Sequence, residues 1–206
     1  MNAVRLAVLM AAVCGLAAVV SRGLADDNSP GGTQVFGVTA RGSSFVYVFD
    51  RSLSMKGAPL VAAKRELLAS IGRLSGVQQF QIVFYNQNAR TMQPPQMVFA
   101  GESGRRQAES YVASVTASGG TDHVQALRLA LRMGPDVIFF LTDADEPQMS
   151  AKELDEIRKK NGGVAIHVIE FKSGHAQGKS ETLRKLAEQN RGEYKYVDVT
   201  ALGAKP

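Results

Sequence analysis

Between residues 44 and 199, short apolar runs rich in β-branched and aromatic residues alternate with longer segments whose apolar residues recur at helical spacing. The apolar runs predict buried strands at 44–50, 79–86, 97–100, 136–143, 163–171 and 193–199. The longer segments predict helices at 60–74, 104–117, 122–133, 150–161 and 180–190. This alternation predicts an α/β fold that is doubly wound, with a mainly parallel central sheet and helices on both faces.

The length and composition fit one globular domain. The chain has 206 residues, of which 45% are hydrophobic and 21% are charged, a balance that argues against a disordered chain. The net charge of +5 is spread along the sequence, with no polybasic arm or stripe. We therefore expect no nucleic-acid partner.

The first 25 residues have the pattern of a secretory signal. Arg5 precedes an uncharged run over residues 6–21, and Gly23-Leu24-Ala25 offers small residues at the −3 and −1 positions. As a helix, 16 residues reach only about 24 Å, short of a hydrocarbon core of ~30 Å. We expect cleavage after Ala25 and a secreted or periplasmic protein. The alternative is an uncleaved anchor with the domain outside the cytoplasm, the one case in which we expect a membrane partner.

The remaining chain divides into three parts. Residues 26–42 are predicted as a linker with a weak strand signal over 34–40, residues 43–202 as the domain and residues 203–206 as a tail. The single cysteine, Cys14, lies inside the signal. A cleaved chain then has no disulfide, thiol nucleophile or cysteine metal ligand.

Three polar clusters lie at the ends of predicted strands or helices. They are Asp50-Arg-Ser52-Leu-Ser54, Gly119-Gly120-Thr121-Asp122 and Thr142-Asp143-Ala-Asp145-Glu146. Each cluster has a simpler explanation by itself: Asp50-x-Ser-x-Ser as a turn, Asp122 as a helix cap and Asp143 as a strand-end residue. In an open α/β sheet, however, ligands bind beyond the carboxyl ends of the strands. Carboxylates and hydroxyls without imidazole or thiol favour a hard cation such as Mg²⁺ or Mn²⁺ over Zn²⁺.

The three clusters, with the apolar residues before them, resemble the three motifs of the von Willebrand factor type A (VWA) domain. The matching segments are 49–55, 119–122 and 139–143, in the order of that family, and the resemblance covers roughly residues 43–202. It implies a metal-ion-dependent adhesion site. Ser52, Ser54 and Thr121 would supply hydroxyl ligands, and Asp50 and Asp143 would act mostly through water and hydrogen bonds.

A site of this kind is suited to binding rather than catalysis. Neutral hydroxyls leave the charge of a cation poorly neutralised, so an Asp or Glu carboxylate of a partner protein is a natural further ligand. The expected cofactor is Mg²⁺, with Mn²⁺ or Ca²⁺ as alternatives. Two positions depart from the family pattern, because Leu53 and Ala144 stand where glycine is common. The resemblance therefore implies a protein-binding module without catalytic residues.

An enzyme remains the alternative. Asp143-Ala-Asp145 after an apolar strand resembles the first motif of haloacid-dehalogenase-type phosphatases, but Glu146-Pro147 replaces the usual Gly-Thr. In that hypothesis Asp143 is the nucleophile, and Ser52, Ser54 and Thr121 have no common role. The hydroxyl residues therefore distinguish the two hypotheses.

Overall fold

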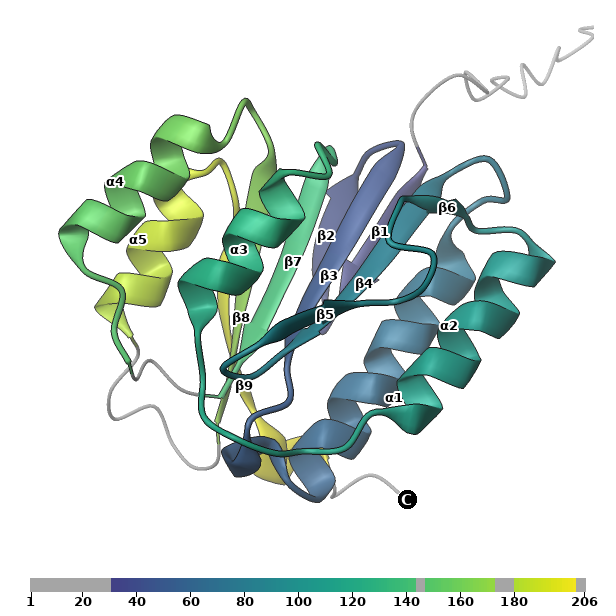
Figure 1. Cartoon of the computed structure of the whole chain (residues 1–206), viewed down its shortest axis with the longest axis horizontal. Helices are drawn as coiled ribbons and strands as arrows, with labels where there is room; N and C mark the ends of the chain where they lie inside the picture. Colours follow the sequence, from purple (N-terminus) through teal and green to yellow (C-terminus); the bar gives the residue numbers. More distant parts are fainter. Residues whose placement is uncertain (1–30, 144–146, 173–179, 203–206) are drawn as a thin grey trace, which may run out of the picture.

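A computed structural model describes residues 31–143, 147–172 and 180–202, which form a three-layer α/β domain around a seven-stranded sheet (Figure 1). The strand order is β5-β4-β3-β7-β8-β9, with β6 also paired to β4. The strands of this sheet are β3 (Ser44–Asp50), β4 (Gln79–Tyr85), β5 (Ala89–Thr91), β6 (Val98–Phe99), β7 (Val137–Thr142), β8 (Ala165–Lys172) and β9 (Tyr194–Asp198). β3, β4, β7, β8 and β9 are parallel to their neighbours, whereas β5 and β6 pair antiparallel with β4. The predicted fold class is confirmed.

Helices cover both faces of the sheet (Figure 1). One face carries α1 (Ala58–Arg73) and α2 (Glu102–Ser114), and the other carries α3 (His123–Leu131), α4 (Ala151–Lys160) and α5 (Glu181–Gln189). Two short 3₁₀ helices, η1 (Leu53–Met55) and η2 (Val199–Leu202), follow β3 and β9. Each face buries its own hydrophobic cluster, and β3 and β7 contribute to both because they lie at the centre of the sheet.

Local capping signals predicted several helix starts correctly. Asp122, Ser150 and Ser180 are the N-caps of α3, α4 and α5, and each side chain accepts a backbone hydrogen bond. The helix predicted from residue 104 begins two residues earlier: α2 starts at Glu102, with Gly101 as its N-cap. Gly104 explains the position of this first turn, since a Cβ atom there would lie 2.1 Å from the carbonyl oxygen of Phe99.

Residues 32–41, expected within a linker, form an antiparallel hairpin of β1 (Gly32–Val35) and β2 (Val38–Arg41). The weak strand signal over 34–40 is divided by Phe36 and Gly37, whose positive φ angles of 47° and 77° reverse the chain. The Phe36 ring packs on Phe171 at a centroid distance of 4.9 Å, and the Phe36 N–H donates to Glu66 on α1. The hairpin therefore completes the cluster that α1 and α2 cover.

Among residues 31–143, 147–172 and 180–202, no helix combines the length and apolar character needed to cross a membrane. The predicted signal over residues 1–25 lies outside the described residues.

Candidate functional site

The chain reverses its direction of winding between β3 and β7, at the centre of the sheet. From β3 it crosses to β4 on one side, and from β7 it crosses to β8 and β9 on the other. The carboxyl ends of β3 and β7 lie side by side, since Phe49 is in register with Leu141. In a doubly wound sheet this is the position at which ligands bind.

Asp50 is the buried centre of this edge. Its residue exposure is 0%, and both carboxylate oxygens accept hydrogen bonds of 2.7 Å, Oδ1 from the Ser52 N–H and Oδ2 from the Thr142 hydroxyl. Burial, with a smaller contribution from the nearby charge of Asp143, raises the pKa of Asp50 to about 6 in spite of these hydrogen bonds. A positive charge bound nearby would therefore stabilise the ionised form of this buried carboxylate.

A row of oxygen atoms leads from this buried position to the surface. The Ser52 and Ser54 hydroxyl oxygens lie 3.1 Å apart, and the Ser54 hydroxyl donates to Asp143 Oδ1 over 2.9 Å. Ser52 is 2% exposed and Asp143 is half-buried, whereas Ser54 is exposed. Burial also raises the pKa of Asp143, against the hydrogen bond from Ser54. Four of the five predicted site residues are therefore brought together, with hydroxyls between two carboxylates.

The loop that carries Thr121 is attached to the first motif through its backbone. The Leu53 N–H donates to the Gly119 carbonyl over 3.0 Å, and the Ser118 N–H donates to the Arg51 carbonyl over 2.9 Å. Gly119 has a φ of 76°, and a Cβ atom there would lie 2.0 Å from Gln87 Oε1. The structure thus brings this loop against Leu53, beside Ser52 and Ser54, but places the half-buried Thr121 side chain in the wall of a separate hollow.

The site includes Thr142, a residue for which the sequence predicts no role. Thr142 belongs to the third cluster, but only the parallel pairing of β3 and β7 shows that its hydroxyl reaches Asp50. Its place directly before Asp143, in the last position of an apolar strand, was the available signal. Ala144, Asp145 and Glu146 lie outside the described residues, and with them the second aspartate of the phosphatase hypothesis.

The oxygen atoms present fit a small hard cation. Adjacent ligands of an octahedral Mg²⁺ at 2.0–2.1 Å lie about 3 Å apart, and the two serine hydroxyl oxygens are separated by 3.1 Å. Within the described ranges, no group of three or more His, Cys, Asp or Glu side chains could hold a metal ion. A cation at this edge would therefore depend on the serine hydroxyls, with two carboxylates to balance its charge.

Comparison with known proteins identifies the fold family. Residues 43–196 match the von Willebrand factor type A domain. The chain belongs to this family. VWA domains are typically protein-interaction modules, and many bind a divalent metal. The hairpin at residues 32–41 lies outside the matched range although it packs into the core.

Individual relatives share parts of this chain. Inter-alpha-trypsin inhibitor heavy chain H4 of Homo sapiens is 29% identical over 97 residues, which are 47% of this chain and 10% of that protein. The H4 chain of Bos taurus is 28% identical over 88 residues, again 10% of its length. This chain therefore spans about a tenth of the curated relatives it matches.

Solved structures share the fold. A von Willebrand factor type A protein from Catenulispora acidiphila has a TM-score of 0.67 and 22% identity, covering 85% of this chain and 48% of that one. The hypothetical protein BatB from Bacteroides thetaiotaomicron has a TM-score of 0.59 and 18% identity, covering 78% and 95%. At these identities the similarity establishes the fold alone.

Proposed function

We propose that this VWA domain is an exported protein-binding module that captures an acidic side chain through a divalent cation, with Mg²⁺ as the expected ion. Asp50, Ser52, Ser54, Thr121 and Asp143 would form the cation site. The observation that carries the proposal is the row of oxygens from Ser52 through Ser54 to Asp143 beside the buried Asp50. This row lies where β3 and β7 end side by side, the binding edge of a doubly wound sheet.

The residues of the proposed site would have different roles according to how deeply they are buried. Ser52 and Ser54 offer neutral oxygens, and Thr121 would add a third from its loop. The two carboxylate oxygens of Asp50 accept hydrogen bonds from Ser52 and Thr142. Asp50 would therefore stabilise the conformation of the first motif and place negative charge beneath the cation. A bound Mg²⁺ would supply an electrophilic position for one more anionic oxygen. Because neutral hydroxyls would supply much of the coordination, this position favours a carboxylate from outside.

Leu53 indicates which kind of partner residue would lie next to the captured acidic side chain. It is 60% exposed although its backbone N–H is fixed by Gly119. An exposed leucine held beside Ser52 and Ser54 offers apolar contact to a partner residue next to the captured acid. Replacing Leu53 by Gly should weaken partner binding without weakening cation binding.

Affinity capture from the exported protein fraction of the source cells tests the proposal. The immobilised protein should retain partners in Mg²⁺ and release them in EDTA, and Thr121→Ala should reduce the retention. Thr116→Ala, an exposed threonine of the same connection, is the matched control. Equal retention in Mg²⁺, in EDTA and with Thr121→Ala would place recognition elsewhere on the domain. Hydrolysis of an aryl phosphate in Mg²⁺ that is lost in Asp143→Asn would favour the phosphatase instead.

Export has its own test. If the signal over residues 1–25 is cleaved, N-terminal sequencing of the exported protein should begin at Asp26. Membrane-bound protein with an intact Met1 would show that the segment is retained as an anchor.

A further inference from the structure

A groove runs along α3, starting at the loop that carries Thr121. Its first hollow, about 380 Å³, is lined by Thr121 and Gln87 from the site loops and by Met149 from the segment before α4. The next hollow, about 560 Å³, lies along α3 and the edge strand β5. The two hollows share Asp122, Val124 and Glu153 in their walls, so they adjoin one another along α3.

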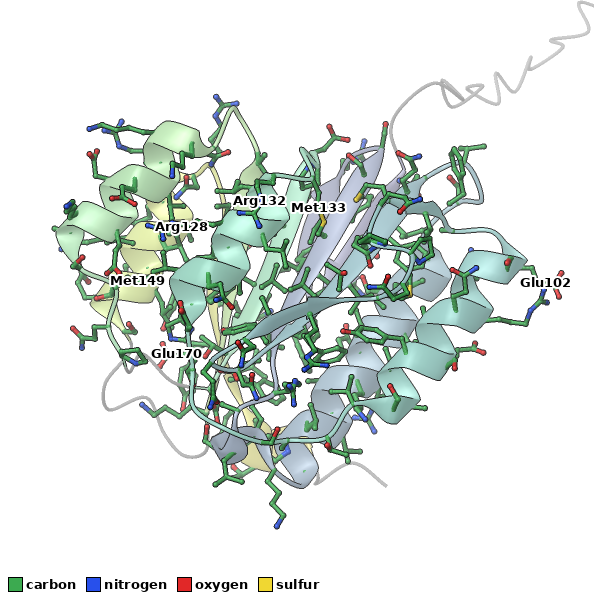
Figure 2. All side chains as sticks on the ribbon, viewed as in Figure 1. Glu102, Arg128, Arg132, Met133, Met149 and Glu170 are labelled. Atoms are coloured by element: carbon green, nitrogen blue, oxygen red, sulfur yellow. The ribbon has the colours of Figure 1, made fainter. Side chains whose placement is uncertain are left out.

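The far end of the groove is basic. Arg128 and Arg132 line the second hollow and also a third of about 330 Å³, to which Lys160 contributes. They lie one helical turn apart at the C-terminal end of α3 (Figure 2). Arg128 forms an ion pair with Glu156 on α4. Arg132 is exposed and has no acidic partner among the described residues. The far end therefore has an unbalanced positive charge.

The acidic residues of the groove are already used by the fold. Asp122 accepts the Gln125 N–H as the cap of α3, and Glu153 accepts the Ser150 N–H and hydroxyl in the capping box of α4. Both carboxylates lie in the middle of the groove, where they would repel a second acidic residue. A ligand that approaches from the cation site thus meets negative charge first and positive charge at the end.

We propose that the groove binds the extended segment that follows the captured acid of the partner, and that a second acidic residue of this segment pairs with Arg132 and Arg128. This inference rests on the proposed function, because the first acid fixes where the segment starts. Asp122 and Arg132, the two caps of α3, are ten positions apart, about 15 Å at the rise of a helix. An extended chain covers this distance in about five residues. The partner is therefore an extended acidic segment with acids five positions apart.

Three synthetic peptides test the spacing by NMR titration of the ¹⁵N-labelled protein in Mg²⁺. The first is Ac-Asp-Gly-Ser-Gly-Ser-Asp-NH₂, with acids five positions apart. The second replaces its last residue by Asn, and the third, Ac-Asp-Gly-Asp-Gly-Ser-Asn-NH₂, keeps two acids but places them two positions apart. We expect the first peptide to bind about three- to fivefold more tightly than the other two, as for a solvent-exposed ion pair. Arg132→Ala should remove this difference and leave binding of the one-acid peptide unchanged.

Arg65→Ala is the matched control, because Arg65 is an exposed arginine on α1, across the sheet from α3. It should leave all three affinities unchanged. Equal affinities of the first two peptides in Mg²⁺ would overturn the groove assignment while the cation site stands. Equal affinities of the first and third peptides would show that net charge alone, and not the spacing of the acids, decides binding. That result would also overturn the groove assignment. Binding of no peptide, or binding that EDTA does not weaken, would contradict the proposed function itself.

Discussion

The Thr142 hydroxyl donates a 2.7 Å hydrogen bond to Asp50 Oδ2, between the last residues of two parallel strands that are 92 positions apart in the chain. Both residues are fully buried. This bond fixes the Asp50 carboxylate under the row of hydroxyls and joins the first motif to the third.

Replacing Thr142 by Val tests this bond, because Val keeps the shape and removes the donor. The buried carboxylate would lose one of its two hydrogen bonds, so the free energy of unfolding should fall by about 1–3 kcal/mol. Urea denaturation measures the change. Thr200→Val, at an exposed threonine in η2, is the control and should stay within about 0.5 kcal/mol of the wild type.

Acidification should stabilise the metal-free protein. Burial raises the pKa of Asp50 to about 6 from the usual 3.8, so between these values the folded protein binds more protons than the unfolded chain. Its free energy of unfolding should therefore rise as the pH falls from 7 towards 4, by at most about 3 kcal/mol from this residue. Unfolding in EDTA as a function of pH measures the effect, and Asp50→Asn should flatten it. A wild type and variant with parallel pH profiles would contradict the assigned pKa.

A bound divalent cation should reverse this dependence of the free energy of unfolding on pH. At pH 7 the ionised Asp50 and Asp143 raise each other's energy, and a bound cation would relieve their repulsion. Stabilisation by Mg²⁺ should reach about 2.7 kcal/mol at a hundredfold excess over Kd. Ser54→Ala should reduce the shift in Tm, whereas Ser103→Ala, an exposed serine on α2, should not. Identical Tm values in EDTA and in millimolar Mg²⁺ would argue against a cation site.

The N-terminal hairpin should be part of the folding unit. Ser70 on α1 lies in a buried network, within 2.8 Å of the Thr33 hydroxyl and 2.9 Å of the Tyr47 hydroxyl. Ser70→Ala would leave these two hydroxyls with fewer partners and should cost about 1–3 kcal/mol in urea denaturation. No loss of stability would show that this network does not tie the hairpin to the domain.

What the sequence predicted well was local. The helices predicted from residues 122, 150 and 180 are confirmed, because Asp122, Ser150 and Ser180 cap backbone N–H groups three residues further on. The buried strands were visible because β3, β4 and β7 are apolar on both faces. The three-residue β5 was missed, since Ala89–Thr91 has no apolar run and pairs only because β4 offers its edge.

The missed features depend on contacts between distant segments. The hairpin at residues 32–41 has only a few buried apolar positions, such as Val35 and Val38. Its glycines and threonines therefore left only a weak strand signal. The hydrogen bonds from Ser54 to Asp143 and from Thr142 to Asp50 require the register of β3 against β7, which no local pattern contains. The motif order predicted five side chains at this edge, and the structure brings four of them together without Thr121.

Electron paramagnetic resonance of Mn²⁺ tests the central claim most directly, because it counts bound ions without needing a partner. The wild-type protein should bind one Mn²⁺ per chain, competed by Mg²⁺, and a variant with both Ser52→Ala and Ser54→Ala should lose this binding while keeping its fold by circular dichroism. Absence of bound Mn²⁺ in the wild type, or equal binding in the folded double variant, would contradict a cation site formed by these hydroxyls.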